Sequence, residues 1–156
     1  MEKSSSDNYI FFLKLSPKLP SWYFTMSTIF SHFNIKLLPI TLADLSKINA
    51  NSGKMQYIIS LTPDMASYQV FSRFREKYLD FALKNNRFCL FDISSFGKID
   101  LAYKIEKKKT YFYFQLPLEI GRICASITEA YFHHANDHQI WPGGRKSKLP
   151  TSTGVN

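Results

Sequence analysis

Three histidines near the carboxyl end have the type and spacing that could bind a metal ion. His133, His134 and His138 lie close to Asp137, and His134 and His138 are four residues apart, so they would share one face of a helix. Imidazole nitrogens and carboxylate oxygens are ligands that zinc accepts. The same residues also suit an exposed helix end, where charged histidines complement the helix dipole. The sequence favours the exposed helix end, and no cofactor is expected.

Two cysteines, Cys89 and Cys124, could serve as nucleophiles if a base and an acid lay beside them. Both lie inside apolar runs, which predicts buried free thiols in a reducing compartment. No serine has the flanking glycines of a nucleophile elbow. The sequence therefore predicts no catalytic residue and a protein that is not an enzyme.

A basic strip could contact nucleic acid, because Lys107, Lys108 and Lys109 precede Tyr111 and Tyr113. Lysines neutralise phosphates and tyrosine rings stack on bases. The formal net charge of +8 fits the same reading, although a basic domain also attracts acidic proteins. A solvated turn explains the strip more simply, and weak nucleic-acid contact remains the alternative.

Five near-continuous apolar runs must provide the framework for any such site. Each run has apolar side chains at both odd and even positions, as in strands of a parallel sheet that are buried on both faces. The five predicted strands are 9–15, 35–40, 56–62, 88–93 and 111–116.

Segments of helical period alternate with these strands. Pro20 and Ser21 open a helix with an apolar stripe that reaches Phe33, and Asn34 can close it in a left-handed conformation. Thr41 resembles the start of a capping box for a second, short helix.

Two later helices have clear opening signals as well. For the third helix we predict Thr62 as N-cap, Pro63 at the first helical position and an apolar stripe that begins at Phe71. Pro117 opens the last helix, whose buried face is expected to hold Ile120, Ile123, Cys124, Ile127 and Tyr131.

Residues 98–109 fit two structures. Strict alternation of apolar residues favours a strand, so this segment could form a hairpin with the strand at 111–116. A fourth helix would instead supply the crossover that keeps the last two strands parallel. Both readings remain open on the sequence alone.

The predicted fold is α/β, a doubly wound five-stranded parallel sheet of order 2-1-3-4-5. We expect a disordered head at 1–7, one domain at 8–135 and a flexible basic tail at 136–156. No apolar run is long enough to span a bilayer, and no secretory leader precedes the domain, so the cytoplasm is the expected location.

Two segments carry a family resemblance. The run 62–65 (TPDM), followed by Phe71 and Phe74, resembles the Met-Pro-x-Met segment that leads into the third helix of bacterial response-regulator receiver domains. The run 114–117 (FQLP) resembles their last strand and its Lys-Pro dipeptide. The resemblance implies a flavodoxin-like fold and a role in signal transduction.

The sequence departs from receivers where they accept a phosphoryl group. Receivers hold Mg²⁺ and the phosphoryl group with carboxylates at the strand ends. Here the run 14–16 (KLS), which ends in Ser16, replaces the acidic pair after the first strand. Ile59 or Ser60 occupies the phosphoacceptor position, and Leu116 replaces the lysine. Only the hydroxyl after the fourth strand is kept, as Ser94 or the serine that follows it.

These departures make the chain similar to pseudo-receivers, which signal through protein contacts without phosphotransfer. The resemblance implies a protein partner, and a second copy of the chain is one candidate. Receivers use the face formed by strand four, the segment after it and strand five for partners. The candidate contact residues on that face are Phe96, Tyr103, Tyr111 and Tyr113.

Overall fold

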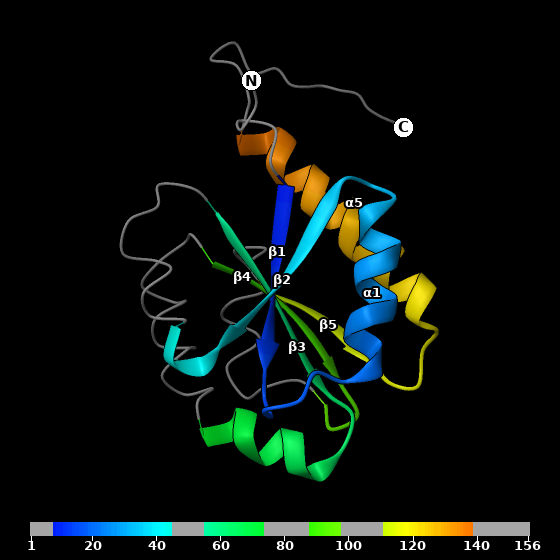
Figure 1. Ribbon diagram of the computed structural model, residues 1–156. Coiled ribbons are helices and arrows are strands. Elements are labelled where there is room, and N and C mark those ends of the chain that lie inside the picture. The colour runs from blue at the N-terminus through cyan, green and yellow to red at the C-terminus, as the bar shows by residue number, and fades with distance from the viewer. Residues whose placement is uncertain (1–7, 45–54, 74–87, 98–110, 139–156) are drawn as a thin grey trace. The chain divides into compact units, whose positions relative to one another are not determined.

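A five-stranded parallel sheet forms the centre of the computed structural model, which describes residues 8–44, 55–73, 88–97 and 111–138. The strand order is β2-β1-β3-β4-β5, so the predicted fold class and strand order are confirmed (Figure 1). The predicted strand ends are correct to within one residue. The strands are β1 (Asn8–Lys14), β2 (Ile35–Thr41), β3 (Gln56–Thr62), β4 (Phe88–Ser94) and β5 (Tyr111–Gln115).

Burial follows each strand's place in the sheet. All seven residues of β3 and all seven of β4 are buried, as their apolar residues at both odd and even positions predict. The expectation that β2 is buried on both faces is wrong. β2 is an edge strand in which Ile35, Leu37 and Ile40 are buried while Lys36 and Leu38 are exposed.

The first helix, α1 (Ser21–Ser31), packs on β1 and β2. Met26 and Phe30 are its buried residues. The Tyr23 hydroxyl donates to the Leu37 carbonyl at 2.8 Å, and its ring meets the ring of Phe12 edge-on at 5.2 Å. Through these two contacts, the Tyr23 side chain holds α1 against β1 and β2.

At the end of α1, one of two sequence predictions is confirmed and the other is wrong. Asn34 has a φ of 60°, the left-handed conformation predicted for it. Phe33 was expected in the buried stripe, but it is 44% exposed. It follows the last helical residue, Ser31, so it no longer keeps the helical direction of Met26 and Phe30.

The second and third helical segments differ in how well their starts were predicted. The Asp44 amide donates to the Thr41 hydroxyl at 3.2 Å, so Thr41 caps residues 42–44 as expected. The third helix begins at residue 65, and its N-cap is Asp64 rather than Thr62. Thr62 is instead the last residue of β3, where the strand pairing extends further than the capping pattern suggests.

The last helix, α5, covers Ile120–His138. Ile123, Cys124, Ile127 and Tyr131 are buried as predicted, while Ile120 is half-buried. A compact unit that contains the sheet and α1 ends at Cys124, and the next unit begins at Ala125. This division falls inside the range 8–135 that the sequence predicts to be one domain.

Several predictions concern residues outside the described ranges. They include the head at 1–7, the helix or hairpin at 98–109 and the tail from 139 onward. α5 includes residues 136–138, the first three residues of the predicted tail. None of the described helices is long and apolar enough to cross a membrane.

Candidate functional site

The carboxyl ends of the strands meet at one edge of the parallel sheet, and backbone hydrogen bonds tie neighbouring ends together. The Ser95 amide donates to the Thr62 carbonyl at 3.2 Å, and the Leu116 amide donates to the Ser94 carbonyl at 2.9 Å. The Ser95 hydroxyl adds a bond to the Pro63 carbonyl at 3.3 Å. The segments after β3, β4 and β5 are therefore held side by side.

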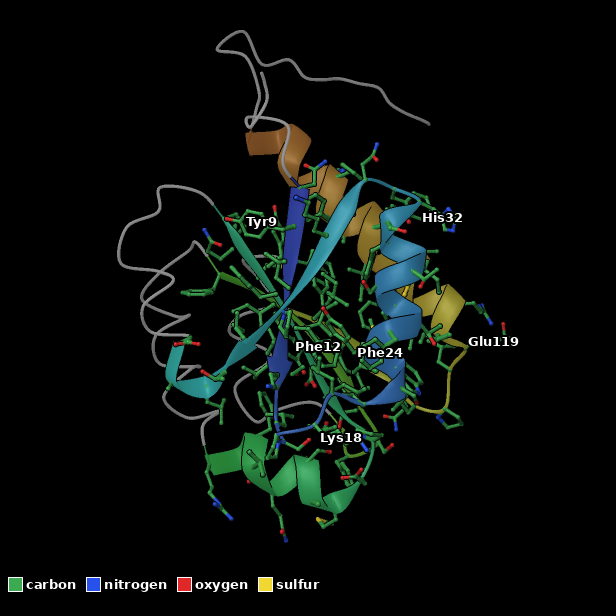
Figure 2. All side chains as sticks on the ribbon, in the orientation of Figure 1. Tyr9, Phe12, Lys18, Phe24, His32 and Glu119 are labelled. Carbon is green, nitrogen blue, oxygen red and sulfur yellow. The ribbon has the colours of Figure 1, made fainter. Side chains whose placement is uncertain are left out.

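Ser16 lies in the exposed loop that follows β1. Its hydroxyl donates to the carbonyl oxygen of Lys18 at 2.7 Å, across a turn of the same loop. Lys18 lies in this loop between β1 and α1 (Figure 2). The Ser16 side chain thus stabilises the turn in this loop. It supplies no charge at the place where the resemblance expects an acid.

The two candidates for the phosphoacceptor position are both buried. Ile59 has no exposed surface and pairs in register with Phe12 on β1 and Phe91 on β4. Ser60 also has no exposed surface, and its hydroxyl lies 3.5 Å from Oδ1 of Asp92, to which it donates. Neither residue presents an acidic group to solvent.

Ser94 and Leu116 occupy the ends of β4 and β5. The Ser94 hydroxyl is buried and accepts a hydrogen bond from the Phe96 amide at 2.9 Å, which shapes the turn after β4. Leu116 is half-buried and precedes Pro117 through a cis peptide bond. The structure therefore brings Ser94 and Leu116 to adjacent strand ends, and Leu116 has no cationic group.

Asp92 is the site residue that the sequence analysis missed. This carboxylate is 1% exposed, and Oδ2 accepts a hydrogen bond from the Tyr111 hydroxyl at 2.6 Å. With Ser60 it forms a polar cluster that links β3, β4 and β5 inside the sheet layer. An acid within the otherwise apolar run 88–93 (FCLFDI) is the signal that could have revealed it, because buried acids need hydrogen-bond partners.

Asp64 is a second carboxylate near this edge, and it is exposed. Its Oδ1 accepts hydrogen bonds from the Ser67 amide at 2.8 Å and the Ser67 hydroxyl at 2.9 Å. These bonds favour the ionised form and lower the pKa of Asp64 below its ordinary value. Asp64 thus places a negative charge at the start of the third helix, where the helix dipole also favours it.

The predicted partner face is only partly at the surface. Phe96 is half-buried, with its ring 4.6 Å from the ring of Tyr68. Tyr113 is also half-buried, and its hydroxyl donates to Oε1 of the exposed Gln115 at 2.6 Å. Tyr111 is only 3% exposed, because its hydroxyl reaches inward to Asp92. Tyr103 and the strip Lys107, Lys108 and Lys109 lie outside the described residues.

The histidine cluster is only partly described. His133 is an exposed residue of α5, whereas the side chains of His134 and His138 lie outside the described set. Among the side chains that the structure describes, no three of His, Cys, Asp or Glu are grouped to hold a metal ion.

Comparison with known proteins gives a structural relative and no sequence relative. No protein-family model and no curated protein sequence matches this chain. The chain is similar to the crystal structure of the signal receiver domain of a putative Luxo repressor protein from Vibrio parahaemolyticus, at a TM-score of 0.54 and 14% identity. The match covers 84% of this chain and 95% of that domain. Together with the strand order, it shows that the chain has the receiver-like, flavodoxin-like α/β fold.

Proposed function

We propose that this chain is a non-catalytic signalling module, similar to a pseudo-receiver, that acts through protein contacts without being phosphorylated. The observation that carries the proposal is the burial of Ile59 and Ser60, the two candidates for the phosphoacceptor position. An isoleucine cannot accept a phosphoryl group, and the Ser60 hydroxyl has no exposed surface from which to attack a phosphate donor.

The two carboxylates near the strand ends support the same proposal, because both have structural roles. Asp92 is 1% exposed and accepts hydrogen bonds from Tyr111 and Ser60. A magnesium ion keeps several of its waters, and a carboxylate so buried offers them no room. Asp64 is exposed, but it caps a helix through Ser67. Among the described side chains, no three of His, Cys, Asp or Glu are grouped as a metal site would require.

The proposed contact surface is the end of the sheet at β4 and β5, with Phe96 and Tyr113 as its aromatic residues. Aromatic side chains supply much of the binding energy in protein interfaces. Both residues are half-buried, so their rings are held in place while part of each remains accessible. Tyr111 is assigned to the interior, since its hydroxyl is bound to Asp92.

The proposed location is the cytoplasm. Cys89 and Cys124 are free thiols, and both are buried. Free cysteines are the usual state in reducing compartments. A partner of a receiver-like module would be another signalling protein in the same compartment.

Photo-cross-linking tests the contact surface. Benzoylphenylalanine replaces Phe96 or Tyr113 in the full chain, and a matched control carries it at Phe24, which is 58% exposed on α1. We expect one partner to be cross-linked from positions 96 and 113 and not from position 24. The purified partner should then bind the Tyr113→Ala variant about tenfold or more weakly, with or without acetyl phosphate and magnesium.

Two results would contradict the proposal. Full affinity of the partner for a folded F96A/Y113A variant would remove the assigned surface. A partner whose affinity rises when acetyl phosphate and magnesium are added would show that phosphorylation controls the module after all.

A further inference from the structure

A cavity of about 360 Å³ lies at the carboxyl ends of β1 and β3. In the sheet order, β1 is flanked by β2 on one side and β3 on the other. From β1 the chain first crosses to β2 on one side and then returns to β3 on the other side. The crevice between the ends of β1 and β3 is therefore the topological switch point of the sheet. Open α/β sheets bind their ligands in the crevice at this place.

The lining of the cavity is mostly apolar. Apolar side chains come from the end of β1, the loop after it, the end of β3 and the start of the third helix. They are Phe12, Leu13, Leu15, Pro17, Pro20, Leu61, Pro63, Ala66 and Val70. Such a lining favours a ligand with an apolar body.

The polar side chains of the lining are Ser16, Asp64 and Ser67. Both serine hydroxyl protons are already used, since Ser16 donates to the Lys18 carbonyl and Ser67 donates to Asp64. What remains for a ligand are acceptors: the lone pairs of the hydroxyls and the carboxylate of Asp64. The Ser67 bonds keep the pKa of Asp64 low, so this carboxylate is ionised near neutral pH.

Three residues of the lining, Pro17, Pro20 and Pro63, have no backbone N–H group. Phosphate-binding loops rely on such amide donors. The cavity thus combines an acceptor carboxylate with three lining residues that offer no backbone donor. Its chemistry disfavours a phosphate or carboxylate ligand and favours a cation or a hydrogen-bond donor.

We propose that this cavity binds a small aromatic molecule that carries one cationic group, with the ring among the apolar side chains and the cation at Asp64. A cavity of about 150 Å³ is enough for benzene in other proteins. A volume of about 360 Å³ therefore accepts a ring system of one or two rings with a short polar arm. Neither Phe96 nor Tyr113 lines the cavity, so this proposal does not depend on the proposed protein contacts.

The test uses tryptamine and indole-3-acetate, which share a ring system and carry opposite charges. Each is titrated into the isotope-labelled full chain while backbone amides are followed by NMR. Tryptamine should move the amides of Ser16, Asp64 and Val70 saturably, and it should bind about fivefold or more tightly than indole-3-acetate. Asp64→Asn, which keeps a capping side chain, should remove most of that preference.

Two matched variants of the third helix locate the binding. Ala66 lines the cavity and Gln69 does not, and both are exposed. Ala66→Phe should abolish tryptamine binding by filling the cavity, whereas Gln69→Phe should leave it unchanged. The proposal is overturned if neither compound gives saturable shifts, if indole-3-acetate binds as tightly as tryptamine, or if folded Ala66→Phe still binds tryptamine.

Discussion

The hydroxyl of Tyr111 donates to Oδ2 of Asp92 at 2.6 Å, between side chains that are 3% and 1% exposed. In the register of the sheet, Tyr111 pairs with Leu90, so the bond runs diagonally from β5 to β4. Ser60 donates to the other carboxylate oxygen from β3. One acid thus links three adjacent strands from within the buried layer.

Tyr111→Phe should destabilise the protein by about 1.5–3 kcal/mol, because it leaves a buried carboxylate without one of its donors. Urea unfolding followed by circular dichroism measures the loss. Tyr113→Phe is the matched control on the same strand. Its hydroxyl donates to the exposed Gln115 at 2.6 Å and has only a long 3.4 Å contact with the Ser94 carbonyl, so about 0.5 kcal/mol or less is expected. Equal losses in the two variants would contradict the assigned role of Asp92.

Asp64→Ala should cost about 0.5–2 kcal/mol, the usual effect of removing an N-cap, and Asp64→Asn should cost less. The effect depends on pH in a defined direction. The folded pKa of Asp64 lies below its ordinary value of 3.8, so the ionised cap stabilises the fold at neutral pH. That contribution declines as the pH falls below this value and through the lowered folded pKa.

Urea unfolding of the wild type and both Asp64 variants across the acidic range checks this prediction. The difference between wild type and Asp64→Ala should shrink as the pH falls. The difference between Asp64→Asn and Asp64→Ala should change little, since neither variant titrates at this position. A wild-type advantage that grows with acid would show that the sign is wrong.

Both cysteines should resist alkylation in the native protein. Burial raises the pKa of Cys124 to about 12 and the pKa of Cys89 further still. The thiolate is the reactive form, so at a pH of about 8 iodoacetamide should label the folded chain far more slowly than it labels a free cysteine. Intact mass spectrometry should show two adducts only in denaturant. Rapid labelling of the folded chain would contradict the burial of these thiols.

Two residues of α1 test how the helix packs. Met26 has no exposed surface, whereas Phe24 is 58% exposed. Met26→Ala should cost about 2–5 kcal/mol through lost burial and a cavity. Phe24→Ala should change stability by about 0.5 kcal/mol or less. Thermal unfolding of the two variants separates the faces, and a larger loss for Phe24→Ala would place the wrong face against the sheet.

The sheet was predictable because burial of a parallel strand leaves a direct trace in the sequence. Gln56–Thr62 and Phe88–Ser94 are buried along their whole lengths, and their runs have apolar residues at both odd and even positions. The exposure of Lys36 and Leu38 in the edge strand Ile35–Thr41 was harder to predict, because its run is as apolar as the others and only tertiary neighbours decide which side chains meet water.

The finer features of the site depend on contacts that sequence spacing does not specify. Thr62 and Asp64 are both good N-caps, and strand pairing with Ser94 decided between them by keeping Thr62 in the sheet. The inward direction of Tyr111 depends on Asp92, which lies 19 residues earlier in the chain. Once that pairing is known, Tyr111 moves from a predicted contact residue to the interior.

The central claim is that the strand ends lack the acid pocket of a phosphorylated receiver. A titration with magnesium and beryllofluoride, followed through backbone amide shifts of the full chain, tests it most directly. We predict that the amides of residues 14–16 and 59–64 show no saturable shift while the spectrum stays well dispersed. Saturable shifts at these strand ends, together with a response near Ser94, would show a working phosphoryl site and contradict the proposed function.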